Sequence, residues 1–288
     1  MYMRHLHINP RTTVPVIFGV LLTVMAMGQI FTVKVFHRNS RPFSTYFLTS
    51  NQNGSEKRCP GVRLSPRILP HIALASYPGS GNTWTRHLLQ QLTGIATGSV
   101  YTDEDLRLNG FPGESLSNGF VVAVKTHELY DETLYDRAIL LIRNPYETFL
   151  SLFKFVHTNH TGAPSIEKYV TGWTMFVAKG IDKYIQFYTS WMKHVDVLPI
   201  FYDMMKQNLT HELHRIKDFL AKSGIKGDIR CALAEPSGSH KRKKSLIPFD
   251  FFYSSGKRTT MNLMIKQIRN AFKKRFRNVT EKMETWLL

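Results

Sequence analysis

Two titratable side chains stand at the end of a short apolar run and could together move a proton and offset negative charge. Val121-Val-Ala-Val precedes Lys125-Thr-His127, and an extended strand points residues two apart to the same face. An imidazole with an ordinary pKa near 6.5 is suited to general-base catalysis, and a lysine neutralises charge that develops beside it. The alternative is a structural histidine whose ring is only hydrogen-bonded at a strand end.

A glycine-rich turn earlier in the chain has the composition of an anion-binding loop. The apolar run Ile72–Tyr77 predicts a buried strand, Pro78-Gly-Ser-Gly-Asn predicts a turn, and Thr83–Leu92 predicts an amphipathic helix that ends at Gly94. A strand followed by glycines and a helix start presents backbone N–H groups and the positive end of a helix dipole to a phosphate. An ordinary strand-to-helix turn has the same spacing.

This turn lacks the residues of a nucleoside-triphosphatase loop. That motif needs a lysine and a Ser or Thr directly after its last glycine, for the terminal phosphates and for magnesium. Here Gly81 is followed by Asn82, which argues against a kinase or GTPase of that class.

A third predicted strand and helix start carry an arginine and a serine. Ala138–Ile142 is apolar, Arg143 follows it, and Pro145 stands where a proline can begin a helix. Ser151 comes eight residues after Arg143, so the helix can return its hydroxyl towards the arginine. The alternative is an arginine that only caps a loop.

Together these segments resemble a known enzyme family. Ser76-Tyr-Pro-Gly-Ser-Gly-Asn-Thr-Trp84 is similar to the 5′-phosphosulfate loop of sulfotransferases that use 3′-phosphoadenosine 5′-phosphosulfate (PAPS). The resemblance is greatest to the sulfotransferase domain of membrane-anchored, WSC-domain-containing sulfotransferases. WSC modules are cysteine-rich, and the two cysteines of this chain, Cys59 and Cys231, are too few for them.

The resemblance implies a fold and a set of contacts to the donor. It implies an α/β fold with a parallel sheet flanked by helices, in a P-loop-like arrangement, with the nucleotide at the carboxyl ends of the strands. His127 would be the general base, and Lys125 would neutralise the sulfuryl oxygens. The turn, the arginine–serine pair at the 3′-phosphate and aromatic side chains near adenine would hold the donor; these residues are Gly79, Ser80, Gly81, Asn82, Thr83, Trp84, Arg143, Ser151 and Tyr202.

Two departures from the family pattern concern charge. Many soluble members carry a lysine at the position of Gly79, and that lysine stabilises the leaving phosphate. Lys125 or Arg86 would have to replace it, because one lost donor of this kind typically costs about 10²–10³ in rate. The family's C-terminal Arg-Lys-Gly segment is also missing, and His240-Lys-Arg-Lys-Lys244 is the one candidate substitute in the sequence.

An apolar stretch near the N-terminus predicts a membrane anchor. Residues 14–33 contain no charged residue, and about twenty residues span the roughly 30 Å core of a bilayer. A cleaved signal peptide is the alternative, but the apolar run continues past the small residues Ala26 and Gly28. We therefore expect a short cytoplasmic tail (1–13), a signal anchor (14–33), a stem (34–70) and a sulfotransferase domain (71–288).

Composition and charge exclude several other classes. The chain has 288 residues, a net charge of +17, 43% hydrophobic and 12% aromatic residues, which excludes a disordered chain. No cluster of His, Cys or carboxylate residues has metal-ligand spacing. Residues 240–277 hold twelve basic residues against Asp250 alone; such a basic face either binds a polyanion or is a solvated surface. We expect no nucleic-acid partner.

The expected activity is transfer of a sulfuryl group from PAPS to a hydroxyl of a glycan, with sialic acid as one option. The product would be 3′-phosphoadenosine 5′-phosphate (PAP), and no metal is required. Four Asn-X-Ser/Thr sites, at Asn53, Asn159, Asn208 and Asn278, favour a lumenal domain in a single-pass type II Golgi membrane protein. Two alternatives remain: a non-catalytic, membrane-tethered polyanion-binding module, and a P-loop small-molecule kinase.

Overall fold

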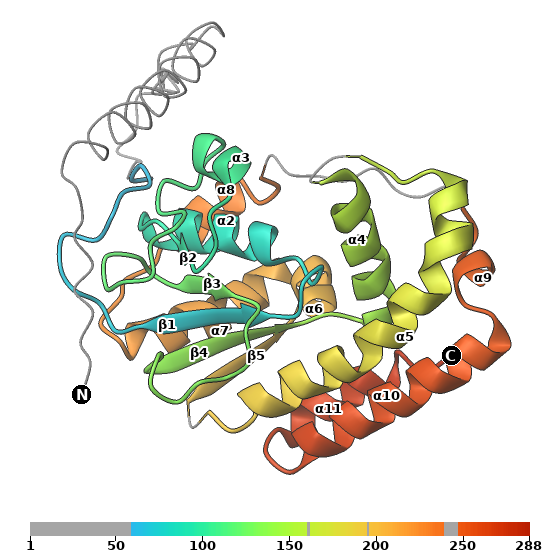
Figure 1. The fold of residues 1–288 in the computed structure, drawn as a ribbon. Coiled ribbons are helices and arrows are strands. Elements are labelled where there is room, and N and C mark those ends of the chain that lie inside the picture. The colour runs from blue at the N-terminus through green and yellow to red at the C-terminus, as the bar shows by residue number, and fades with distance from the viewer. Residues whose placement is uncertain (1–58, 160–161, 195, 239–246) are drawn as a thin grey trace, which may run out of the picture. The chain divides into compact units, whose positions relative to one another are not determined.

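A parallel sheet organises the part of the chain that the computed structural model describes, residues 59–159, 162–194, 196–238 and 247–288. Five strands of this part form the sheet in the order β2-β3-β1-β4-β5 (Figure 1). They are β1 (Ile72–Ser76), β2 (Gly98–Ser99), β3 (Val124–Thr126), β4 (Arg137–Ile142) and β5 (Val197–Phe201). Because β1 pairs with β3 on one side and β4 on the other, its carboxyl end lies at the switch point where such sheets bind ligands.

Helices cover both faces of this sheet (Figure 1). Leu74 of β1 packs in one core cluster with α2, α7 and α8, whereas Ala73 packs in the other with α4, α5, α10 and α11. This alternation is the two-residue period of a strand. The helices are α2 (Asn82–Thr93), α3 (Glu104–Leu108), α4 (Pro145–Thr158), α5 (Ile166–Trp191), α6 (Tyr202–Gln207), α7 (Leu209–Ala221), α8 (Ile229–Ala234), α9 (Phe249–Phe252), α10 (Ser255–Lys273) and α11 (Arg277–Glu284).

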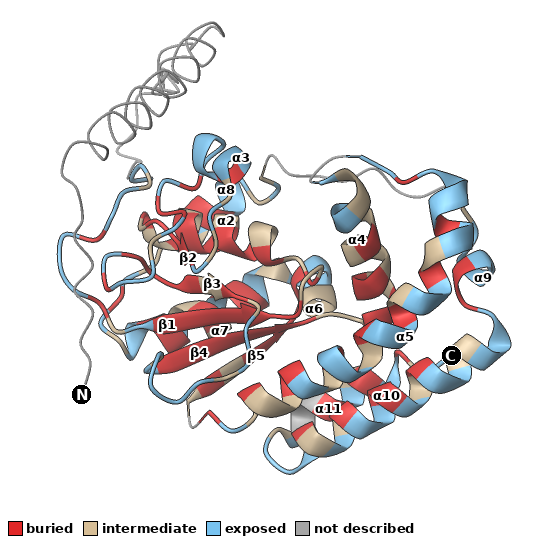
Figure 2. Ribbon diagram, in the orientation of Figure 1, coloured by how far each residue is buried: buried red, intermediate tan, exposed pale blue. Residues whose placement is uncertain are grey.

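The central strands are buried on both faces, which explains their nearly continuous apolar sequence. Every residue of β1 and β4 is buried (Figure 2), as is usual for a parallel sheet between two helical layers. The predicted α/β fold with helices flanking a parallel sheet is therefore confirmed for this part of the chain.

Short sequence features determine where the helices after β1 and β4 end or begin. α2 ends at Gly94, whose left-handed conformation (φ 68°) closes the helix. α4 begins at Pro145, and the side chain of Asn144 caps it by accepting a hydrogen bond from the Tyr146 N–H. The sequence missed β2, because its two residues, Gly98 and Ser99, form no apolar run.

The predicted N-terminal segments fall partly outside the described residues. The compact unit that contains the sheet runs from Lys57 to Leu288, so the last residues of the predicted stem pack on the domain. Arg63 bridges to Ile95, Leu69 is buried, and Cys59 forms a disulfide with Cys231 of α8. The predicted anchor at 14–33 and the tail before it lie outside the described residues, within which no helix is long and apolar enough to span a bilayer.

Candidate active site

Two glycines let the loop after β1 lie against its neighbours. Gly79 and Gly81 have φ angles of +88° and +98°, in the region that favours glycine. A Cβ on Gly79 would lie 2.7 Å from the carbonyl oxygen of Thr148 in α4, and one on Gly81 would lie 2.5 Å from the ring of Tyr202. Both positions therefore exclude a side chain. In particular, Gly79 has no room for the lysine that many soluble family members carry there.

The loop leads into a helix start that has no side-chain cap. Gly81 is the N-cap residue of α2 and makes no capping bond through a side chain. The first N–H groups of an α-helix have no partner within the helix, so these amides are available to an anion, which the helix dipole also favours.

Two of the predicted side-chain donors of this loop are engaged inside the protein instead. Asn82 is buried, and its Nδ2 donates to the carbonyl oxygen of Leu74 and to Ser76 Oγ. The fully buried Ser80 places its Oγ 3.4 Å from the hydroxyl of Tyr188. Asn82 therefore braces the loop against β1, and Ser80 braces it against Tyr188 of α5. The contact of this loop with a phosphate stays a prediction. Thr83 is half-buried and stays a predicted donor.

His127 has a defined tautomer at the tip of β3. Its Nδ1 lies 2.6 Å from the backbone carbonyl oxygen of Ser76, the last residue of β1. A carbonyl oxygen only accepts hydrogen bonds, so Nδ1 carries the proton and Nε2 keeps its lone pair. The ring is thus prepared to accept a proton at Nε2.

The environment of the imidazole keeps it neutral. Burial, and then the positive charge of Lys125, lower the pKa of His127 from 6.5 to about 4. Our expectation of an ordinary imidazole pKa is therefore wrong, and the physical reason is desolvation. Burial, followed by the charge of Arg86, also lowers the pKa of Lys125. Lys125 pairs in register with Leu74 of β1, and its charge acts on His127; the shared face of the two side chains stays a prediction.

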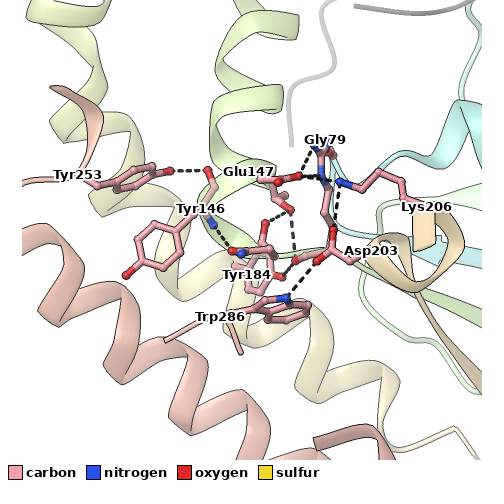
Figure 3. A network of polar contacts seen from close by, with 11 residues as sticks. Gly79, Tyr146, Glu147, Tyr184, Asp203, Lys206, Tyr253 and Trp286 are labelled. Atoms are coloured by element: carbon pink, nitrogen blue, oxygen red, sulfur yellow. Dashed lines mark hydrogen bonds and ion pairs between the residues drawn. The ribbon is translucent and has the colours of Figure 1, made fainter. Parts of the chain in front are cut away.

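Arg143 links the tip of β4 to the glycine loop. Its Nη1 donates to the carbonyl oxygen of Gly79 (3.0 Å), and its Nη2 donates to Glu147 Oε2 (2.8 Å). Figure 3 shows Glu147 close to the loop at Gly79 and to Lys206, whose Nζ lies 3.7 Å from the same carboxylate oxygen. Burial alone would raise the pKa of Glu147, but Arg143 and Lys206 lower it overall. Lys206 Nζ also lies 3.4 Å from Asp203 Oδ1, so the two cations of this cluster are matched by two carboxylates.

Two aromatic side chains line the loop on its other side. The rings of Trp84 and Tyr202 meet edge to face with centroids 5.4 Å apart, and the guanidinium of Arg143 lies 4.4 Å from the centre of the Tyr202 ring. Trp84 is fixed further by a hydrogen bond from its Nε1 to the carbonyl oxygen of Pro236 (2.7 Å). The structure thus brings together the two aromatic residues that the sequence assigned to adenine.

Arg86 does not face the loop. It is fully buried, its guanidinium lies 2.6 Å from the carboxylate of Glu114, and its Nε donates to Thr97 Oγ1 (3.0 Å). The suggestion that Arg86 replaces the family's lysine at the donor is therefore corrected, because these partners already hold its guanidinium in the core.

Ser151 lies in α4 and is half-buried, and its contact to a 3′-phosphate stays a prediction. The segment 240–244 lies outside the described residues.

Sequence reasoning missed one residue in contact with both candidate catalytic side chains. The ring of Tyr101 stacks on the His127 imidazole with centroids 5.5 Å apart, and Lys125 Nζ lies 5.4 Å from the centre of the Tyr101 ring. Tyr101 follows the two-residue strand β2, so no sequence pattern marked it.

Within the described ranges, no group of three or more His, Cys, Asp or Glu side chains could hold a metal ion.

Comparison with known proteins identifies the family. The profile of the Sulfotransferase domain family matches residues 69–286, which is most of the chain. The chain belongs to the sulfotransferase family. A WSCD family member of Aedes aegypti is 41% identical to this sulfotransferase over 186 residues, which cover 62% of this chain and 59% of the relative. A WSCD family member of Drosophila melanogaster is 37% identical, with 70% and 66% covered.

A solved structure agrees with the fold of this sulfotransferase. A mouse sulfotransferase, SULT7A1, crystallised with PAP, superposes with a TM-score of 0.50 at 19% identity, covering 76% of this chain and 90% of that one. A likeness at this identity establishes the shared fold. The chain spans about three fifths of the length of the curated WSCD relatives that it matches.

Proposed function

We propose that this protein transfers a sulfuryl group from PAPS to a hydroxyl group. The observation that supports the proposal is that a neutral imidazole, protonated at Nδ1, lies beside a glycine loop with an uncapped helix start. Ser76 contacts both parts, because its carbonyl oxygen accepts from His127 Nδ1 and its Oγ accepts from Asn82 of the loop. A base and an anion site at one sheet edge are what an in-line group transfer needs.

The transfer step can be written with these residues. The oxygen of the acceptor hydroxyl forms a bond to the sulfur, the bond between the sulfur and the 5′-phosphate oxygen breaks, and PAP leaves. The hydroxyl proton passes to His127 Nε2. Lys125, whose charge acts on His127, offsets the negative charge on the sulfuryl and bridging oxygens. Because little covalent chemistry is left to the protein, positioning and charge supply most of the rate.

Other residues of the same edge would hold the donor. The amides at the start of α2 suit the 5′-phosphate, and Arg143, with Ser151, suits the 3′-phosphate. Trp84 and Tyr202 already contact each other, and we assign adenine to this pair. The glycine positions fit a close backbone approach to phosphate, since a Cβ at Gly79 or Gly81 would clash within the protein.

We assign the acceptor to the hydroxyls of glycans, sialic acid among them, in the Golgi lumen. The disulfide between Cys59 and Cys231 supports a secretory compartment, because disulfides persist in oxidising compartments. The glycosylation sites and the apolar stretch at 14–33 support the same location for a protein anchored as type II. The names of the WSCD relatives mention no acceptor, so the assignment to glycans is our own.

The decisive experiment is radiolabelled sulfate transfer from PAPS to a glycan library by the full chain. His127→Ala should lower turnover by about 10²–10⁴ because the general base is lost, while PAP binding measured by calorimetry changes little. His87→Ala is the matched control, because that imidazole contacts the carbonyl oxygen of Glu235 instead. Retained turnover in His127→Ala would refute the mechanism, and transfer of phosphate from ATP with magnesium would support the kinase alternative.

One surface feature favours a second candidate function, the binding of a polyanion. A shallow hollow of about 640 Å³ at the turn between α10 and α11 is lined by Asn270, Lys273, Lys274, Arg275 and Arg277. Four cations around one hollow suit a chain of anionic sugars. Replacing Lys273 and Lys274 by Ser should lower the salt concentration at which a sulfated glycan column releases the protein. Unchanged elution would exclude this function for the hollow.

A further inference from the structure

Tyr101 is the side chain that both candidate catalytic residues share. It lies just after β2, on the strand next to β3, where Ser99 pairs in register with Lys125. Its ring stacks on the His127 imidazole at 5.5 Å between centroids and an interplanar angle of 25°. The Lys125 ammonium lies 5.4 Å from the centre of the same ring, within reach of a cation–π interaction.

The hydroxyl of Tyr101 adds two hydrogen bonds to this contact. It accepts from the backbone N–H of His127 (3.1 Å) and donates to Glu128 Oε1 (2.6 Å). The ring of Tyr101 therefore contacts the face of the imidazole, and its hydroxyl binds the backbone N–H of His127. Ser76 holds the remaining side through Nδ1. An imidazole restrained at three places has little freedom to turn Nε2 away from an acceptor.

We infer that Tyr101, with Glu128, is a positioning residue that fixes the His127 imidazole and the Lys125 ammonium in their reactive places. This inference deepens the proposed function and rests on its assignment of His127 as the base. It goes beyond the chemistry of the glycine loop because Tyr101 belongs to none of the three sequence segments from which the site was predicted. Tyr101 also covers one face of the imidazole, so its ring excludes water from that face.

Several charged groups surround this unit and must be considered in any pH experiment. Lys125 of β3 and Arg86 of α2 act on His127 with positive charge. Glu114 and Asp103 act on Lys125 with negative charge, and Glu128 follows His127 directly. Substitutions at Tyr101 change none of these charges, so a shift in the titration of His127 reports on packing and hydration.

The closing experiment measures the imidazole titration by NMR in the full-length protein without donor, and turnover in the same variants. The signal of His127 is identified by its loss in His127→Asn. In the wild type it should titrate near pH 4. In Tyr101→Leu, loss of the ring admits water, and the midpoint should move up by about one to two pH units towards the ordinary imidazole value.

Tyr101→Phe tests the hydroxyl alone and keeps the ring. It should lower kcat by roughly 3- to 10-fold, the value of one net hydrogen bond, with PAP affinity unchanged. Glu128→Ala should lower kcat by a smaller factor, because the hydroxyl still accepts from His127. Tyr253→Phe is the matched control: it removes a buried hydroxyl that donates to the carbonyl oxygen of Tyr146 (2.7 Å), away from His127, and should leave kcat and the titration alone.

The outcomes separate this inference from the proposed function. An unshifted His127 titration in Tyr101→Leu, or an unchanged kcat in Tyr101→Phe, overturns the positioning role. A wild type without sulfate transfer, but with the titration shift present in Tyr101→Leu, overturns the enzymatic proposal and keeps the contact between ring and imidazole. If Tyr101→Leu does not fold, the test is the kcat of Tyr101→Phe compared with that of Tyr253→Phe. A lower kcat in Tyr101→Phe supports the positioning role, and equal values overturn it.

Discussion

Arg143 Nη1 donates a hydrogen bond to the carbonyl oxygen of Gly79 across 3.0 Å. This bond joins the tip of β4 to the loop after β1, two segments 64 residues apart in the chain. The same guanidinium is paired with Glu147 and lies on the ring of Tyr202. The arginine proposed for the 3′-phosphate therefore also shapes the loop proposed for the 5′-phosphate.

Arg143→Ala should weaken PAP much more than adenosine 5′-phosphate. Charge-assisted hydrogen bonds are worth about 1.5–3 kcal/mol each, so we expect roughly a 10- to 100-fold loss for PAP. The smaller loss for adenosine 5′-phosphate would come from the loosened loop. Calorimetry on both nucleotides measures this, with Arg107→Ala as control, since that arginine pairs only with the exposed Glu104. Equal losses would place the 3′ site elsewhere.

The pH dependence of kcat/KM should have its acid limb near pH 4. In the proposed mechanism His127 acts as the neutral imidazole, and burial with the charge of Lys125 lowers its pKa to about 4. A lowered pKa keeps the base unprotonated further into the acid range, so the rate stays level from pH 7 to about pH 5 and falls below that. A limb at pH 6.5 in the free enzyme would contradict the buried environment of the ring. Lys125→Met should move the limb upward, because one positive neighbour is lost.

Gly79→Lys should impair the protein even though it restores the family's usual residue. The new side chain would start from a backbone with φ of +88° and a Cβ 2.7 Å from the carbonyl oxygen of Thr148. Two controls separate backbone strain from steric clash. Gly110→Ala introduces a Cβ at a φ of +103° into open space, and Gly61→Ala introduces one into open space without a positive φ. Thermal unfolding should rank Gly61→Ala as most stable and Gly79→Lys as least stable. Higher turnover in Gly79→Lys would show that the loop rearranges to accept the lysine.

Arg86→Ala should act on stability and not selectively on catalysis. Its removal leaves the buried carboxylate of Glu114 without its cation, and breaking a buried pair in this way costs about 3–5 kcal/mol. Replacing both residues by apolar ones, Arg86→Met with Glu114→Leu, should recover most of the unfolding free energy. Denaturant titrations measure both variants. A folded, stable Arg86→Ala whose turnover alone has fallen would return Arg86 to the donor site.

The sequence was sufficient for the parts of the site that depend on local chemistry. The glycine loop, the capped start of α4 and the strand before each are encoded within about ten residues, so pattern and propensity locate them. Strand periodicity predicted a shared face for Lys125 and His127, and the resemblance to sulfotransferases supplied their proposed roles. These features give the fold and the positions of His127, the loop and Arg143.

The remaining features depend on contacts between distant segments. Whether Arg86 faces a ligand or the core is decided by Glu114 and Thr97, which come from outside its helix. The lowered pKa of His127 arises from burial, which no two-residue spacing shows. Tyr101 reaches His127 because the two-residue strand β2 places it beside β3.

The disulfide between Cys59 and the buried Cys231 also acts on α2. Cys231 belongs to α8, and the residues just after that helix accept hydrogen bonds from Trp84 and His87 of α2. The crosslink thus steadies the helix that begins at the glycine loop. Production in an ordinary bacterial cytoplasm, which keeps thiols reduced, would yield a preparation without this tether, so recombinant material should be secreted or folded oxidatively before its ability to bind nucleotide is judged.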